Sequence, residues 1–198
     1  MYIKELENYD KYVGYQNGRA GALTNANTIF RDLHKIDITL NKDSYILDIG
    51  CRAGAYTVRE FIKNGHPNSY GIDIGESAQQ HWLTYECKDN LKCADIHNGN
   101  PFDHKWDFIT MSHTLEHLYD PHKVIKIIHE SMSKDGVIHG IIPIEESIEG
   151  FQKHNPHMVM FESHEEHVKF YENNGFDVFY DELELAKAPN SIIFARKK

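Results

Sequence analysis

The sequence has no long hydrophobic run, few cysteines and no excess of basic residues. No stretch approaches the ~20 consecutive apolar residues of a transmembrane helix. The three cysteines, Cys51, Cys87 and Cys93, include no Cys-x-x-Cys pair, which favours a reduced, cytoplasmic protein over a disulfide-stabilised one. The formal net charge of −9 disfavours strong nonspecific binding to nucleic acids. These absences leave a globular protein without a membrane span as the expectation.

The 198 residues suit a domain with a full hydrophobic core, and the 40% hydrophobic and 26% charged content is ordinary. Residues 1–43 are predicted to form an N-terminal helical cap or lid, with a helix over 22–38. Residues 44–198 are predicted to form a single domain. Within the lid, three residues could meet a ligand carboxylate, although packing or surface roles also fit them. They are Tyr12, Tyr15 and Arg19.

Short apolar runs alternate with helical patterns through most of the chain. The runs rich in β-forming residues predict strands over 44–49, 69–74, 91–97, 106–111, 137–142, 176–185 and 191–195. Helical patterns are predicted over 55–64, 76–86, from 120 onward, and 162–173. The alternation favours parallel strands with crossover helices, whereas the closely spaced last two strands favour an antiparallel pair. The expected fold class is α/β: a Rossmann-like, doubly wound, seven-stranded, mostly parallel sheet with one antiparallel edge strand and helices on both faces.

The most informative motif follows the first predicted strand and reads Asp48-Ile-Gly50-Cys51-Arg52-Ala-Gly54. A glycine turn between a strand and a helix lets a ligand approach the backbone, and the helix directs unpaired N–H groups toward the same place. The turn is not the dinucleotide fingerprint Gly-x-Gly-x-x-Gly, because Arg52 stands where a middle glycine might be. A carboxylate at Asp48 suits a positively charged or hydroxyl-bearing ligand better than a pyrophosphate.

This motif resembles motif I of the class I S-adenosylmethionine (SAM)-dependent methyltransferases of the small-molecule type. Further similar pieces are Asp-Phe-Ile at 107–109, Leu-Glu-His at 115–117, Asp-Pro at 120–121 and a glycine-containing turn before the strand at 137–142. The resemblance covers about residues 45–143 and continues more weakly beyond. It implies SAM as the cofactor, with S-adenosylhomocysteine (SAH) as its product. It also implies methyl transfer to a small or medium-sized acceptor, with oxygen or nitrogen favoured over carbon.

The resemblance also assigns residues to the methionine and ribose parts of the cofactor. Gly50, Cys51 and Gly54 would line the methionine part, with Asp48 near its ammonium group. Arg52 would either meet the cofactor carboxylate or project into solvent. Asp73, at the end of the second predicted strand, would accept hydrogen bonds from the ribose hydroxyls, as acids in this position do. An N-terminal cap of the next helix is the alternative for this acid.

Four further residues complete the predicted cofactor contacts. The resemblance implies that Asp95 accepts a hydrogen bond from the exocyclic amine of adenine and that the side chain of Ile96 covers the ring. Asp95 could equally be a turn residue. Ile74, beside the ribose-binding acid, and Ser112, after the fourth strand, are the remaining candidates.

The segment His113-Thr-Leu-Glu116-His117 leaves three interpretations open. His113 or His117 could act as the base or orient the acceptor, the segment could simply stabilise a turn, or it could hold a divalent metal with His154 or His157. The metal interpretation is weakened by one difference. Some small-RNA and quinone methyltransferases bind a metal with a related Glu-x-x-Glu-His motif, whereas this chain has His113 in place of the first glutamate. A zinc peptidase also uses His-x-x-Glu-His, but on a long helix with a further ligand. We predict catalytic roles for the two histidines and no resident metal.

Two other function classes fit parts of the sequence. One is a SAM- or nucleotide-binding module without catalysis, because a fold does not determine a function. The other is an NAD-dependent oxidoreductase. The predicted partner is a small-molecule acceptor rather than a nucleic acid, and the oligomeric state is left open by the sequence.

Overall fold

The computed structural model describes residues 28–144, 159, 161–185 and 189–198. The chain forms two compact units, Met1–Pro101 and Phe102–Lys198. Residues 28–35 are helical, within the predicted helix over 22–38. The proposed lid residues lie outside the described residues, as do two candidate metal ligands; these are Tyr12, Tyr15, Arg19, His154 and His157. The predicted boundary between a lid and a single domain at residue 43 therefore stays a prediction.

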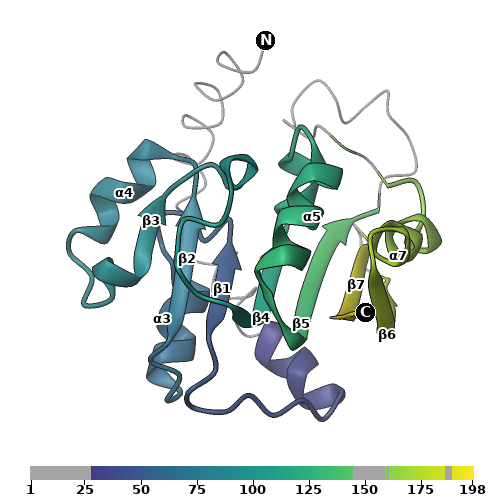
Figure 1. Ribbon diagram of the computed structural model, residues 1–198, viewed down its shortest axis with the longest axis horizontal. Helices are drawn as coiled ribbons and strands as arrows, with labels where there is room; N and C mark the ends of the chain where they lie inside the picture. Colours follow the sequence, from purple (N-terminus) through teal and green to yellow (C-terminus); the bar gives the residue numbers. More distant parts are fainter. Residues whose placement is uncertain (1–27, 145–158, 160, 186–188) are drawn as a thin grey trace. The chain divides into compact units, whose positions relative to one another are not determined.

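The first unit contains three parallel strands in the order β3-β2-β1 (Figure 1). They are β1 (Ile46–Ile49), β2 (Ser69–Asp73) and β3 (Leu91–Cys93). Helix α3 (Tyr56–Lys63) connects β1 to β2, and α4 (Glu76–Trp82) lies between β2 and β3. Parallel neighbours require such crossovers, and their carboxyl ends then meet at one edge of the sheet. Ligands of open α/β sheets bind outside that edge.

Packing in the first unit brings the loop after β1 against β2. All four residues of β1 are buried, as expected for a strand of a parallel sheet covered on both sides. A Cβ atom on Gly71 in β2 would lie 2.9 Å from both Cys51 Sγ and Val58 Cγ2. The glycine therefore permits close contact between β2, the loop and α3.

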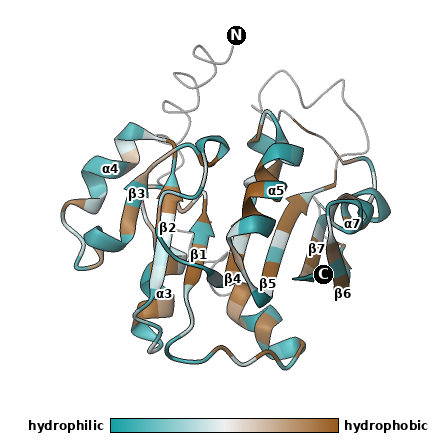
Figure 2. Ribbon diagram, in the orientation of Figure 1, coloured by the Kyte–Doolittle hydropathy of each residue, from teal (hydrophilic) through white to brown (hydrophobic). Residues whose placement is uncertain are grey.

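The second unit contains four strands in the order β4-β5-β7-β6. Strand β4 (Trp106–Ser112) pairs in parallel with β5 (Met132–Pro143), after the crossover helix α5 (Pro121–Ser131). Strand β7 (Asn190–Lys197) pairs antiparallel with β5 on one side and with β6 (Phe176–Glu184) on the other. Most of β4 and β5 is hydrophobic in Figure 2, and the fully buried side chains of this unit include Trp106, Phe108, Tyr171, Phe176 and Phe194.

The predicted fold class is confirmed as a Rossmann-like, seven-stranded, mostly parallel mixed sheet. Two details differ from the sequence-based expectation. The reversed strand β7 is inserted between β5 and β6, so the edge strand of this unit is β6 rather than the reversed one. The residues near Gly136, which were predicted to form a turn, lie inside β5. The register between β4 and β5 shifts there, because Trp106 pairs with Met132 and Phe108 already pairs with Val137.

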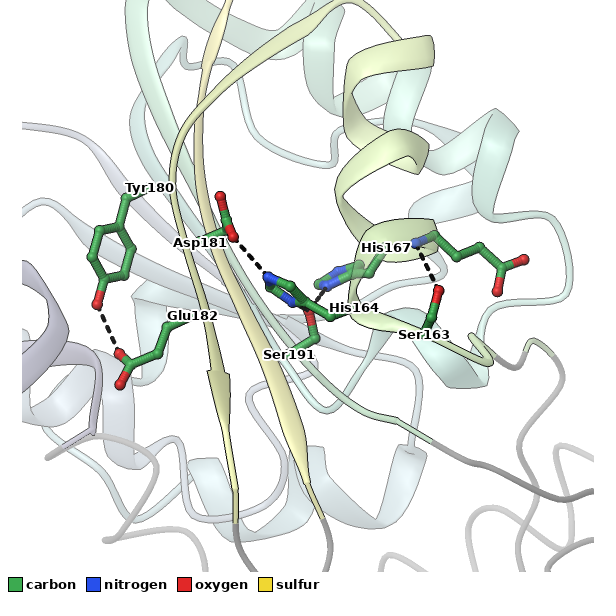
Figure 3. A network of polar contacts seen from close by, with 8 residues as sticks. Ser163, His164, His167, Tyr180, Asp181, Glu182 and Ser191 are labelled. Carbon is green, nitrogen blue, oxygen red and sulfur yellow. Dashed lines mark hydrogen bonds and ion pairs between the residues drawn. The ribbon is translucent and has the colours of Figure 1, made fainter.

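Helix α7 (His164–Asn173) is attached to β6 and β7 by a network of polar side chains, in which His167 and Ser191 are buried and Asp181 is exposed (Figure 3). The hydroxyl of Ser191 lies 2.6 Å from His164 Nδ1 and 2.7 Å from His167 Nδ1. On its other side, His164 Nε2 lies 2.7 Å from Asp181 Oδ1. Because Ser191 is fully buried, this Asp-His-Ser arrangement connects secondary-structure elements and does not present a nucleophile to solvent.

Candidate functional site

The loop after β1 adopts a backbone that ordinary residues rarely accept. Gly50, Arg52 and Ala55 have φ values of 82°, 55° and 43°, in the left-handed region that favours glycine. The Gly50 N–H donates to the carbonyl of Ile72 at 2.8 Å. The loop is therefore attached to β2, and the strained positions lie where the sequence predicts a ligand to approach.

Side chains of the first unit hold three consecutive carbonyl groups of this loop. Each carbonyl oxygen accepts a hydrogen bond from a different residue, so the orientation of the peptide groups is fixed before any ligand binds. The pairs are Trp82 Nε1 with Arg52 O at 3.1 Å, the Tyr85 hydroxyl with Ala53 O at 3.2 Å, and Arg59 Nη1 with Gly54 O at 3.4 Å.

Asp73 joins the end of β2 to the same loop. Its Oδ2 accepts a hydrogen bond from the Arg52 backbone N–H, and its Oδ1 accepts one from the Gly75 N–H, both at 2.9 Å. The side chain is only 3% exposed. The structure thus brings the predicted ribose-binding acid into direct contact with the predicted methionine-binding loop. The bond to Gly75, which precedes α4, also shows that the acid supports the start of this helix.

Asp48 is buried beneath the loop at the end of β1. Burial raises the pKa of its carboxyl group to about 7, a hydrogen bond with Thr57 partly offsets that rise, and the charge of Asp73 adds to it. Burial also raises the pKa of Asp73, although the N–H groups of Gly75 and Arg52 work against that rise. Two neighbouring acids with little solvation favour a ligand that carries a positive charge or hydroxyl donors.

The other predicted cofactor residues of this unit lie next to β2. The Ala94 N–H donates to the Asp73 carbonyl at 2.9 Å, which places the start of the Asp95 segment beside the acid. Asp95 Oδ1 accepts from the backbone N–H of His97 at 2.9 Å and lies 2.7 Å from its Nδ1. Asp95 therefore caps the short 3-10 helix Ile96–Asn98, as the turn alternative predicts. Ile96 is buried.

The remaining candidates belong to the second unit. Ser112 ends β4, and His113 follows with φ 52° and its N–H bonded to the Ile141 carbonyl at 2.8 Å. His113 Nδ1 lies 3.5 Å from Oε1 of the buried Glu116. Burial tends to raise the pKa of Glu116, but the hydrogen bond with His113 and the charges of His117 and His113 outweigh it, so the pKa is lowered. Glu116 is thus a buried carboxylate that stays ionised between two imidazoles.

The histidine motif does not lie on a long helix. Only Leu115–His117 are helical, in a three-residue 3-10 helix. The geometry of a zinc peptidase, which places both histidines on one extended helix, is therefore absent from this segment. Among residues 28–144 and the described part of the C-terminal half, no three His, Cys, Asp or Glu side chains are grouped closely enough to bind a metal ion.

Comparison with known proteins shows what family this architecture belongs to. A family model described as a methyltransferase domain matches residues 23–183, which is most of the chain. The chain belongs to this methyltransferase family. The resemblance found in the sequence is therefore confirmed.

Relatives of the methyltransferase fit this assignment. The ubiquinone biosynthesis O-methyltransferase of Coxiella burnetii is 33% identical over 93 residues, which cover 45% of this chain and 38% of that protein. The match thus spans less than half of the curated relative. A SAM-dependent methyltransferase from Aquifex aeolicus has a TM-score of 0.71 at 18% identity, with 96% of this chain and 98% of that chain covered. Magnesium protoporphyrin IX methyltransferase from Synechocystis, solved with bound SAM, has a TM-score of 0.63 at 16% identity, with 91% and 81% covered.

Several residues that shape the methyltransferase loop were missed by the sequence-based prediction. They are Thr57, Arg59, Trp82 and Tyr85. A tryptophan in the helix after the predicted ribose-binding acid was the one signal available, because a buried indole N–H usually needs a partner. Within the described residues, no helix is long and apolar enough to span a membrane.

Proposed function

We propose that this methyltransferase transfers the methyl group of SAM to a small or medium-sized acceptor, at an oxygen or nitrogen atom. The observation that carries the proposal is the pair of hydrogen bonds around Asp73. They place a buried acid at the tip of β2 against the backbone of the loop after β1. The family assignment and the acid at Asp48 support the same ligand.

In the proposed complex, each part of SAM meets a different group of the first unit. The methionine part lies along Gly50–Gly54, with its ammonium group near Asp48. Asp73 accepts hydrogen bonds from the ribose hydroxyls, with Ile74 beside it. Asp95 and Ile96 contact the adenine, which requires the carboxylate of Asp95 to bind the adenine amine in addition to His97. Ser112, which ends β4 in the second unit, stays a contact predicted from the sequence.

The chemistry needs little from the protein beyond positioning. The methyl group of a sulfonium is already activated, so alignment with the acceptor supplies much of the rate enhancement. A general base is needed where the acceptor is a weakly acidic hydroxyl or a protonated amine. We assign the acceptor side to His113 and His117, because Glu116 is an ionised partner that can orient an imidazole by its Nδ1.

The first test is ligand binding to the full chain. Calorimetry should show binding of SAH and no binding of NAD, because the loop lacks the middle glycine that a pyrophosphate needs. With radiolabelled SAM, transfer to a panel of phenols, catechols and amines should then be detectable. Binding of NAD instead of SAH would contradict the proposal. SAH binding without transfer to any acceptor would favour a non-catalytic SAM-binding module.

The affinity for SAH should depend on pH through Asp48. Only the ionised carboxylate attracts the ligand ammonium, and its pKa is raised to about 7 in the free protein. Between pH 6 and pH 7.5 its ionised fraction rises from about one tenth to about three quarters, so the affinity should rise about eightfold. Calorimetry at the two pH values measures the change, and Asp48→Asn should remove most of it. An equally steep pH dependence in that variant would place the titrating group elsewhere.

A further inference from the structure

Arg52 stands in a conformation that its own side chain disfavours. Its φ of 55° lies in the left-handed region, which costs an L-residue about 1–2 kcal/mol and costs glycine almost nothing. The sequence nevertheless carries arginine here, where the dinucleotide fingerprint would place its middle glycine. A strained residue that persists at a ligand-binding turn is evidence that its side chain has a use there.

The backbone of Arg52 is fixed from both sides. Its N–H donates to Asp73 Oδ2 at 2.9 Å, and its carbonyl accepts from the indole of Trp82 at 3.1 Å. Trp82 is almost fully buried, so this second bond is shielded from water. The two contacts over-determine the left-handed conformation and set the direction in which the Arg52 side chain leaves the loop.

Arg52 as a residue is partly buried, yet its guanidinium forms no ion pair or hydrogen bond with any described residue. It is close enough to Asp48 and Asp73 for its charge to oppose the rise that burial causes in the pKa of both acids. Arg59, a cation of α3 that contacts the loop, is already engaged. Its guanidinium lies 4.5 Å from the centre of the Tyr85 ring, and its Nη1 donates to the Gly54 carbonyl.

A SAM molecule brings a carboxylate as well as an ammonium group to this loop. Two buried acids suit the ammonium and the ribose, but they repel the carboxylate unless a cation lies beside it. We propose that Arg52 binds the carboxylate of the cofactor's amino acid part, and that Asp73 and Trp82 act as positioning residues for it. This role rests on the proposed SAM site, and it makes Arg52 the residue that distinguishes SAM and SAH from adenosyl compounds without an amino acid.

Calorimetry with two probes tests this role. SAH carries the amino acid, whereas 5′-methylthioadenosine keeps the adenosine and the sulfur but lacks it. Arg52→Gly should bind SAH at least tenfold more weakly than the wild type, while its affinity for 5′-methylthioadenosine stays within about twofold. The glycine accepts a φ of 55°, so the variant is expected to fold. Lys88→Gln, which removes an exposed cation of the same unit, should change neither affinity.

Trp82→Phe provides the test of positioning, because it keeps an aromatic side chain and removes the indole N–H donor. It should weaken SAH binding severalfold and leave 5′-methylthioadenosine binding nearly unchanged. Unchanged SAH affinity in Arg52→Gly would overturn the assignment. If Arg19→Gln weakens the binding of SAH but not of 5′-methylthioadenosine, and Arg52→Gly changes neither, the assignment to Arg52 is also overturned. The carboxylate is then bound by the N-terminal segment. A wild-type chain that binds neither probe would instead refute the proposed SAM site itself.

Discussion

Replacing His167 with asparagine will change the pH dependence of the protein's stability by about 2 kcal/mol between pH 7 and pH 5. His167 is completely buried in α7, and burial, together with the charge of His164, lowers its pKa to about 3. In the unfolded chain its pKa returns to about 6.5. The imidazole is therefore neutral in the folded protein throughout this pH range.

The sign of the effect follows from where the proton binds. As the pH falls below 6.5, the unfolded chain takes up a proton at His167 and the folded protein does not. The free energy of unfolding therefore falls, by about 2 kcal/mol at pH 5 and by more at lower pH, and it recovers above pH 7. In His167→Asn this contribution is absent, and the amide nitrogen or oxygen can still reach Ser191, as the imidazole Nδ1 does at 2.7 Å.

The wild-type curve alone would hide this contribution, because Asp48 acts in the opposite direction. Its pKa is raised to about 7 in the folded protein, so folding takes up a proton as the pH falls and stability rises, by about 2 kcal/mol between pH 7 and pH 5. In the wild type, these two groups together should therefore change the free energy of unfolding very little between pH 7 and pH 5. His167→Asn should become more stable on acidification relative to the wild type, and Asp48→Asn less stable.

Urea unfolding of the three proteins at pH 5, 6, 7 and 8 measures these differences. The values at pH 8 serve as the baseline, because there His167 is neutral in both states. Parallel curves for His167→Asn and the wild type would show that the imidazole titrates normally and is not buried as described. If the stability of Asp48→Asn depends on pH in the same way as that of the wild type, the expected pH dependence of SAH binding loses its basis.

Local sequence patterns were sufficient to predict the strands and the turn that form the proposed cofactor site. Runs of β-forming residues located the strands, and Gly50 marked a turn whose φ of 82° only glycine accepts easily. The proximity of Asp73 to the loop was also predictable, because the carboxyl ends of neighbouring parallel strands meet at one edge of the sheet. These inferences need only periodicity and strand direction.

The features that the sequence did not reveal depend on contacts between distant segments. Arg52 is held in a left-handed conformation by Asp73 and Trp82, which follow it by 21 and 30 residues. The insertion of β7 between β5 and β6 is set by which strand edges remain open, and closeness in sequence does not determine that. The third strand ends at Cys93, earlier than predicted, because Asp95 instead caps a 3-10 helix.

Asp73→Ala is expected to affect both cofactor binding and folding. Loss of one charge-assisted hydrogen bond to the ribose, worth about 1.5–3 kcal/mol, should weaken SAH binding at least tenfold. The substitution also removes the acceptor of the Arg52 and Gly75 N–H groups, which are bonded at 2.9 Å to a buried carboxylate. Each N–H left without a partner lowers the free energy of unfolding by about 1–3 kcal/mol.

A second variant separates the two effects. Asp73→Asn keeps one acceptor oxygen for the backbone and removes the charge, so it should lose less stability than Asp73→Ala while SAH affinity still falls about tenfold. The exposed Asp89 offers the control, since Asp89→Asn removes a negative charge of the same unit at a residue outside the proposed site. Calorimetry and urea unfolding of all three variants measure both quantities. If Asp73→Asn binds SAH like the wild type, the acid supports only the loop and α4, and the ribose must be bound by another residue.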